Sequence, residues 1–352
     1  MRILCHAVPF NVGQEPAITI QNRRVFIKQR PDGVPTLDDF GVEDVDIDDV
    51  PAGHIVAKVD TLSMDAWIRT TLNEEGMHKT GDIGTTIRAL GVGQIVESNS
   101  AKLAVGDWVY GLMSAQTFAL LPDSAVTKIV PEDGIAPSAF AGPLGITTGL
   151  TAWVGLIAVG EVQEKDIVVV SGAAGAVGSI VVQLAKARGA AVIGIAGGPD
   201  KCKYLTDTLG ADFAIDYKNS DVAAQLKAAA PNGVNVFFDN VGGEILDHVL
   251  DNLAAAEARV VICGAISQYQ HLADVRGPKL YLRLAERNAS MRGFVVSHYD
   301  QKYPEAMQEI SDLLRSGKLV LPEHVVDGID KFPEALFMLF NGKHRGNLVV
   351  RP

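Results

Sequence analysis

The feature that most constrains the fold of this chain is a short apolar segment followed by a glycine-rich turn and an amphipathic segment. Residues 167–171 predict a buried strand, residues 172–178 a tight turn, and residues 176–188 a helix. Further strands are predicted at 191–196, 211–216, 234–239 and 259–263, and further helices at 199–209, 220–230 and 244–253. Continuous apolar strands that alternate with helices indicate a parallel sheet covered on both faces. Such crossovers wind in one direction, so we predict a doubly wound α/β domain.

The residues on either side of this alternating segment have a different pattern. Before it, short strands such as 54–62 and 87–97 follow one another between Gly, Pro and Asp turns, without helices between them. Toward its end, residues 293–297 predict an edge strand and residues 304–317 a long amphipathic helix. We therefore expect three parts: a β-rich domain over residues 1–141, the doubly wound domain over 142–318, and a C-terminal return to the β-rich domain over 319–352.

The charge balance limits the partners of the chain. The 352 residues include 42 acidic and 31 basic side chains, a net charge of −11, and no basic stripe. We therefore expect neither nucleic acid nor an anionic membrane as a partner. The apolar runs are broken by Pro and Gly, and the N-terminal residues lack the apolar core of a secretion signal, so we predict no membrane span and no signal peptide.

The cysteines and histidines argue against a zinc site. Cys5, Cys202 and Cys263 are odd in number and far apart, which suits a reducing cytoplasm and offers neither a disulfide framework nor paired metal ligands. Catalytic zinc in dehydrogenases requires Cys and His ligands, and structural zinc usually requires four cysteines. The early histidines, His6, His54 and His78, stand alone, so we predict no metal.

The turn at residues 172–178 carries a glycine pattern that suits a dinucleotide. It joins a strand to a helix, which is the context that such a fingerprint requires. Gly175 lets the backbone approach a pyrophosphate, whose charge is met by N–H groups at the helix N-terminus, and Gly178 lets helix and strand pack closely. Ala173 stands where the first glycine of the pattern usually lies. The alternative is a tight connection without a ligand, but the place of the turn at the start of the alternating series favours a cofactor.

The end of the second strand indicates which dinucleotide binds. NAD sites usually carry Asp or Glu there, which binds the ribose 2′-hydroxyl. This strand ends at Ala196 before two glycines, and Lys201 follows at the start of the next helix. Asp200 lies past the strand end and is assigned to the first turn of that helix. A cation attracts a 2′-phosphate that a carboxylate would repel, so we predict NADPH; a solvated surface lysine is the alternative.

Several short segments together resemble one group of enzymes. They are NRRV at 22–25, GVGQ at 91–94, VES at 96–98, GDWV at 106–109, GAAGAVGS at 172–179, GGPDKC at 197–202, IDYK at 215–218, FDNVGG at 238–243 and CGAISQY at 263–269. From about Asn22 onward, the chain resembles the leukotriene B4 12-hydroxydehydrogenase, prostaglandin reductase and curcumin reductase group of zinc-independent medium-chain dehydrogenases/reductases. This group includes plant alkenal double-bond reductases.

The resemblance implies a fold, a cofactor and a set of contacts. It implies a GroES-like β-rich catalytic domain, a doubly wound Rossmann domain, NADPH and a homodimer. It places Lys201 and Tyr217 around the adenosine phosphate. The other implied cofactor contacts are Gly175, Ala176, Val177, Gly178, Asn240, Cys263, Ala265, Ile266, Ser267, Phe294, Val295 and Val296.

Two departures from the group pattern bear on the site. Where the group usually has Asp-Pro-Tyr-Met-Arg, this chain has Asp-Ala-Trp-Ile-Arg at 65–69, so Trp67 replaces a tyrosine that often faces substrate. Near the C-terminus His344 replaces an asparagine that usually contacts cofactor. The resemblance therefore places Trp67 in the substrate pocket and His344 at the cofactor, and it leaves the identity of the substrate open.

Without a metal, reduction of a conjugated double bond fits better than oxidation of a simple alcohol, which loses its Lewis acid. Hydride would go to the β-carbon of an α,β-unsaturated carbonyl compound, and the charge that collects on the carbonyl oxygen needs a hydrogen-bond donor. Tyr269 is the candidate donor, because it follows the strand at 259–263 near the carboxyl edge of the sheet and a phenol is protonated at neutral pH. On position alone, a loop tyrosine that packs against the pocket is the alternative.

Two other functions remain open. One is reduction of a quinone or oxidation of an allylic hydroxyl in a lipid-like substrate, which uses the same cofactor chemistry. The other is a protein that binds NADPH without catalysis, against which the tyrosine and the full cofactor segment count.

Overall fold

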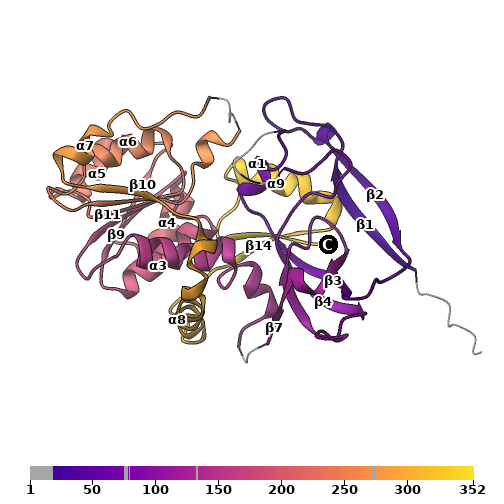
Figure 1. Ribbon diagram of the computed structural model, residues 1–352. Helices are drawn as coiled ribbons and strands as arrows, with labels where there is room; N and C mark the ends of the chain where they lie inside the picture. Colours follow the sequence, from indigo (N-terminus) through magenta and orange to yellow (C-terminus); the bar gives the residue numbers. More distant parts are fainter. Residues whose placement is uncertain (1–18, 75–77, 79, 132–133, 271–273) are drawn as a thin grey trace, which may run out of the picture.

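The strand that precedes the glycine-rich turn lies inside a parallel sheet. The computed structural model describes residues 19–352 except 75–77, 79, 132–133 and 271–273 (Figure 1). In this part of the chain, β8 (Ile167–Ser171) pairs in parallel with β9 (Ala191–Ala196) on one side and with β11 (Val236–Asp239) on the other. The full order is β10-β9-β8-β11-β12-β13. Because the strand order reverses between β8 and β11, a ligand crevice is expected at their carboxyl ends.

The two faces of this sheet explain why its strands are continuously apolar. Val168 and Val170 belong to one core cluster together with residues of α3 (Ala176–Ala187). Val169, between them, belongs to a second cluster with residues of α5 (Val222–Ala229) and α6 (Gly243–Asp251). Each face of the sheet is therefore covered, as the sequence predicts. The other elements of this parallel-sheet domain are α4 (Pro199–Asp207), β10 (Phe213–Asp216), β12 (Arg259–Ile262), α7 (Leu282–Glu286), β13 (Ser290–Gly293) and α8 (Tyr303–Arg315).

The predicted edge strand at residues 293–297 is wrong in position. The edge strand is β13, whose pairing with β12 runs from Arg259 opposite Ser290 to Ile262 opposite Gly293. The chain then turns into a 3₁₀ segment at Val296–Lys302. The apolar residues 294–296 suggested a strand, but the Phe294 ring packs against Gly155 and Phe238 in the core instead.

Before the parallel-sheet domain lies a β-rich domain, at the right of Figure 1. Its larger sheet is built on β3 (His54–Ser63), which pairs antiparallel with β4 (Gly91–Ser98) and β6 (Phe118–Pro122). Further elements are β1 (Ile20–Ile27), β2 (Phe40–Ile47), α1 (Trp67–Thr70), β5 (Trp108–Gly111) and β7 (Val126–Ile129). Cys5, His6 and the N-terminal residues in which the sequence predicts no secretion signal lie outside the described residues.

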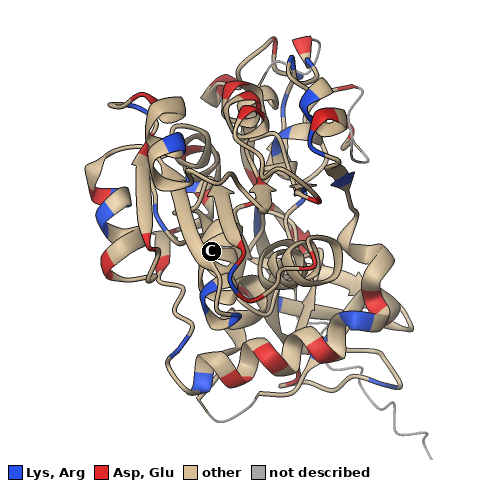
Figure 2. Cartoon of the chain, turned by 90° about the vertical axis from the view of Figure 1, so that its left-hand side faces the viewer, with Lys and Arg blue, Asp and Glu red and all other residues tan. Residues whose placement is uncertain are grey.

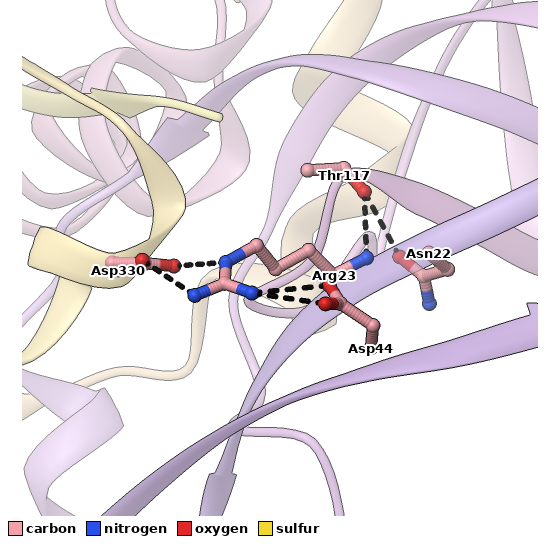
Figure 3. A network of polar contacts seen from close by, with 5 residues as sticks. All are labelled: Asn22, Arg23, Asp44, Thr117 and Asp330. Carbon is pink, nitrogen blue, oxygen red and sulfur yellow. Dashed lines mark hydrogen bonds and ion pairs between the residues drawn. The ribbon is translucent and has the colours of Figure 1, made fainter.

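The C-terminal residues return to the β-rich domain, as the sequence predicts. β15 (Asn347–Arg351) pairs antiparallel with β3 and in parallel with β14 (Glu323–Asp327), and α9 (Phe332–Phe340) packs on the same core. Arg23 on β1 binds this C-terminal segment. Its guanidinium donates to Asp330 of the segment at 2.6 and 2.8 Å and to Asp44 on β2 at 3.1 Å (Figure 3). The return thus completes the β-rich domain after the chain has built the parallel-sheet domain.

A helical segment connects the two domains. Residues 146–159 form consecutive π and α turns that lead from the β-rich domain into β8, and the sequence pattern did not predict a helix there. Over the parallel-sheet domain, basic and acidic side chains are interspersed (Figure 2). Within the described ranges, no helix is long and apolar enough to cross a membrane.

Candidate functional site

The glycine-rich turn after β8 has one open and one packed glycine. Gly172 has a positive φ of 58° and its carbonyl accepts from the N–H of Gly175 at 3.0 Å, which closes the turn. A Cβ on Gly175 would meet only that carbonyl oxygen, at 3.3 Å, whereas a Cβ on Gly178 would lie 2.7 Å from the Ala173 Cα. The space beside Gly175 at the N-terminus of α3 can therefore accept a pyrophosphate, and the space at Gly178 is filled by the backbone of the turn at Gly172 and Ala173.

A buried aspartate joins the two strands that flank the crevice. Ser171, at the end of β8, donates through its hydroxyl to Asp239, at the end of β11, at 2.7 Å. Asn240 donates its side-chain amide to the Ser171 carbonyl at 2.7 Å, and Asp239 also accepts from the N–H of Gly242 at 3.0 Å. Burial raises the pKa of Asp239, and these hydrogen bonds oppose the rise. Sequence reasoning named Asn240 but missed Ser171 and Asp239, which end adjacent apolar strands.

The residues predicted around an adenosine phosphate lie together beyond β9. A Cβ on Gly197 would lie 2.9 Å from both the Tyr217 ring and the Lys218 side chain, so these residues cover the strand end. Burial and the nearby Lys218 lower the pKa of Lys201. Among the described residues, neither lysine has a carboxylate within ion-pair distance. Two cations without a counter-ion fit the phosphorylated ribose of NADPH, and Lys218 is the member that sequence reasoning left out.

Tyr269 lies beside the same crevice. The segment that carries it is joined to β11: Cys263 donates its N–H to the Asp239 carbonyl at 2.9 Å, and Ile266 donates to the Asn240 carbonyl at 3.2 Å. The Tyr269 hydroxyl oxygen accepts from the Ala265 N–H at 3.1 Å. Burial raises the pKa of Tyr269, and burial also raises the pKa of the Cys263 thiol to about 12. Both groups are therefore protonated at neutral pH.

Trp67 lies in the β-rich domain and is hydrogen bonded to a buried carboxyl group. Its indole N–H donates to Asp65 at 3.2 Å. The same carboxyl group accepts from the hydroxyls of Ser63, at 3.0 Å, and of Thr147 in the segment that leads to β8, at 3.1 Å. Burial raises the pKa of Asp65 despite these bonds. Asp65 therefore fixes the Trp67 ring near the junction of the two domains, a role that sequence reasoning did not assign.

The C-terminal return reaches the glycine turn. Gly346 donates its N–H to the Ala174 carbonyl at 2.9 Å and forms a parallel bridge with Gly175. His344, two residues earlier, is 9% exposed. Burial, followed by the charge of Lys201, lowers the pKa of His344 to about 4, so its ring is neutral at physiological pH. His344 therefore lies near Lys201, and its contact with the cofactor stays a prediction.

Residues 294–296, which the resemblance places at the cofactor, have three different environments in the structure. The Phe294 ring faces the core at Gly155, and Val295 is 55% exposed. The Val296 carbonyl accepts from the Tyr303 hydroxyl at 3.2 Å. Contact of all three with a nicotinamide stays a prediction.

A cavity of about 220 Å³ lies between the two domains, and Tyr269 and Trp67 are not among its lining residues. It is bordered by Gln270 from the parallel-sheet domain and by residues of the β-rich domain. The lining residues of the β-rich domain are Val34, Pro35, Arg69, Leu336, Phe337, Phe340 and Asn341. Apolar side chains dominate this lining, which suits an apolar ligand. Sequence reasoning could not find the cavity, because its walls come from four separate segments.

Two family models match the two halves of this architecture. The model described as the N-terminal domain of oxidoreductase matches residues 23–129, and the model described as zinc-binding dehydrogenase matches residues 176–312. The described residues contain no group of three or more His, Cys, Asp or Glu side chains that could hold a metal ion. Fold and site together define a two-domain dehydrogenase/reductase built to hold a dinucleotide.

Relatives and solved structures narrow this class. The NADPH-dependent curcumin reductase of Escherichia coli (strain K12) is 32% identical over 339 residues, 94% of this chain and 97% of that protein. The NADP(+)-dependent 2-alkenal reductase of Nicotiana tabacum is 34% identical over 338 residues, again 94% and 97%. The crystal structure of CurA from Vibrio vulnificus in complex with NADPH is 34% identical, with a TM-score of 0.88 over 94% of this chain and 98% of that one. The chain belongs to the medium-chain dehydrogenase/reductase family, in the group of these NADPH-dependent reductases, which confirms the resemblance seen in the sequence.

Proposed function

We propose that this protein uses NADPH to reduce the carbon–carbon double bond of α,β-unsaturated ketones and aldehydes. NADPH, when bound, would supply the hydride that is added to the β-carbon, and a proton added to the α-carbon would complete the reduction. The names of the curcumin reductase and alkenal reductase relatives support this reaction class.

The Tyr269 hydroxyl is the observation that carries the proposal. During reduction, negative charge collects on the carbonyl oxygen of the substrate, and a fixed hydrogen-bond donor stabilises it. The raised pKa of Tyr269 keeps the phenol protonated. Because its oxygen already accepts from the Ala265 N–H, its own hydrogen is left to donate to a substrate.

We also propose the cofactor contacts and domain limits that the sequence suggests. The turn at 175–178 would bind the pyrophosphate, and Lys201, Tyr217 and Lys218 the phosphorylated ribose. Asn240, residues 263–267 and residues 294–296 would lie along the nicotinamide half, His344 would contact the cofactor, and Trp67 would line the substrate pocket. The domain limits would be 1–141, 142–318 and 319–352. The free thiols of Cys202 and Cys263 support a cytoplasmic enzyme.

A homodimer is proposed from the edge of the parallel sheet. Within the described part of the chain, β13 pairs with β12 on one side and with no strand on the other, and all of its residues are exposed. Met291 on this strand is an apolar side chain with 37% of its surface exposed. An open edge of this kind can pair with its own copy across a two-fold axis. Light scattering should give twice the chain mass for the native protein and one chain mass for Met291→Lys; a native monomer would refute the dimer.

The reaction is tested by NADPH consumption with a panel of a 2-alkenal, an enone, a quinone and, with NADP⁺, an allylic alcohol. We expect the fastest turnover with the alkenal or the enone. Faster turnover of the quinone or the alcohol would overturn the assignment in favour of those reactions. If the protein binds NADPH but turns over none of these compounds, the result would support the alternative of a protein that binds NADPH without catalysis.

The role of Tyr269 is tested by Tyr269→Phe with Tyr281→Phe as the matched control. Tyr281 is 58% exposed on the same domain. We expect Tyr269→Phe to lower kcat for the enone by about 100-fold, the usual effect of removing one oxyanion donor, while the Kd for NADPH stays constant. Tyr281→Phe should change neither. Unchanged turnover in Tyr269→Phe removes this residue from the mechanism.

A further inference from the structure

The loop between α9 and β15, residues 341–346, borders the phosphate side of the crevice. Its last residue, Gly346, is hydrogen bonded to Ala174 in the glycine turn. Its second residue, Gly342, is so close to α4 that a Cβ there would lie 3.7 Å from the Lys201 ammonium nitrogen. This loop, which belongs to the C-terminal return, therefore lies between the pyrophosphate turn and the first turn of α4.

Arg345 in this loop is an exposed cation with a fixed position. Its guanidinium carbon lies 5.5 Å from the centroid of the Tyr204 ring on α4. Tyr204 is only 5% exposed, so the ring is a rigid support. Among the described residues, Arg345 has no carboxylate within ion-pair distance. A guanidinium held over a ring keeps the N–H groups at its edge available for an anion.

Arg345 and Lys201 are on the same side of α4. Lys201 and Tyr204 are three residues apart on this helix, so their side chains are neighbours on one face. Lys218 covers the end of β9, since a Cβ on Gly197 would lie 2.9 Å from its side chain, and its charge lowers the pKa of Lys201. The nearby carboxylate of Asp216 accepts from the N–H of Gly198, beyond the end of β9, at 2.8 Å and from the Asn219 side chain in its own turn at 2.7 Å. Arg345, Lys201 and Lys218 thus lie around the end of β9 and the start of α4, and among the described residues none of the three forms an ion pair, although the Asp216 carboxylate is nearby.

We infer that Arg345 binds the 2′-phosphate of NADPH, opposite Lys201 and Lys218, and so contributes to the choice of NADPH over NADH. This inference rests on the proposed function. The planar guanidinium can donate two parallel hydrogen bonds to a phosphate, which a lysine cannot. Because Arg345 comes from the C-terminal return and the lysines from the parallel-sheet domain, the 2′-phosphate bridges the two domains, and NADH lacks this bridge.

The test compares Arg345→Ala with Lys343→Ala, which removes an exposed cation from the same loop. Dissociation constants are measured by calorimetry for NADPH, NADH, 2′,5′-ADP and 5′-AMP. Arg345→Ala should raise the Kd for NADPH and for 2′,5′-ADP by about five- to tenfold. This is the effect expected for a charge-assisted hydrogen bond that is weakened by exposure to solvent. The Kd values for NADH and 5′-AMP should change by less than about twofold in Arg345→Ala. In Lys343→Ala, the Kd values for all four ligands should change by less than about twofold. Arg345→Lys should restore only part of the affinity.

The outcomes separate this inference from the proposed function. Equal weakening of NADPH and NADH by Arg345→Ala would assign Arg345 to the pyrophosphate and overturn the 2′-phosphate contact. If Lys343→Ala weakened NADPH binding as much as Arg345→Ala, the effect would come from the overall positive charge of the loop. That result would also overturn the specific contact of Arg345. Full NADPH preference in Arg345→Ala would overturn the role of this residue while leaving the NADPH assignment of the native protein intact. A native protein that binds NADH as tightly as NADPH would instead refute the proposed cofactor.

Discussion

Gly175 and Gly178 lie three residues apart, yet an added methyl group meets very different surroundings at the two positions. At Gly175 the backbone is extended, with φ −84° and ψ 179°, and the new Cβ would meet only the Gly172 oxygen at 3.3 Å. Alanine adopts this conformation freely, and its smaller unfolded-state entropy offsets the tight contact. We therefore expect Gly175→Ala to change the free energy of unfolding by less than about 0.5 kcal/mol. At Gly178 the Cβ would lie 2.7 Å from the Ala173 Cα, and overpacking against backbone should cost about 2 kcal/mol.

Cofactor binding should respond differently to the same methyl groups. The Cβ of Gly175→Ala would project into the open space that the pyrophosphate needs at the N-terminus of α3. Loss of one charge-assisted hydrogen bond from a backbone N–H is worth about 1.5–3 kcal/mol. The Kd for NADPH should therefore rise by about 10- to 100-fold, although the protein remains as stable as the native one.

Two measurements on both variants test this reasoning. Urea unfolding gives the free energy of unfolding, and calorimetric titration gives the Kd for NADPH. Native-like binding by Gly175→Ala would refute the placement of the pyrophosphate beside this residue. Destabilisation of Gly175→Ala to the same extent as Gly178→Ala would refute the division of roles between the two glycines.

Three further predictions concern stability. Asn22 is 4% exposed and accepts from the Phe118 N–H at 3.0 Å, so Asn22→Ala should lower the free energy of unfolding in urea by about 2 kcal/mol; a change below about 0.5 kcal/mol would contradict this. The buried Tyr204 hydroxyl lies near the Ser179 side chain but makes no hydrogen bond of ordinary geometry in the described structure, so Tyr204→Phe should leave the urea midpoint unchanged or raise it, and a clear decrease would show that the contact with Ser179 stabilises the fold. The pKa of His344 is lowered from 6.5 to about 4 in the folded protein, so its contribution to stability is present above pH 6.5 and lost as the pH falls toward 4. His344→Asn should remove about 2–3 kcal/mol of the fall in unfolding free energy over this range, and an unchanged pH profile would contradict the burial of a neutral ring.

Local spacing in the sequence determined the parallel-sheet domain and the identity of the family. The apolar run of β8, the glycines of the turn and the helix that follows are consecutive, so their mutual geometry depends on residues that a reader of the sequence sees together. The missing acid after β9 and the presence of Lys201 likewise lie within a few residues of each other. These patterns predicted a doubly wound domain and NADPH, and the NADPH-dependent relatives bear out both.

Only the tertiary structure decided which distant residues share the site. Arg345 meets Tyr204 because β15 pairs with β3 and carries its preceding loop back to the glycine turn, a contact between residues far apart in the chain. The edge strand β13 likewise lies earlier than the sequence pattern predicts, because pairing with β12, and not apolar content, sets its register. Periodicity reports which face of an element is buried, but contacts between elements depend on strand pairing and packing, which no single segment encodes.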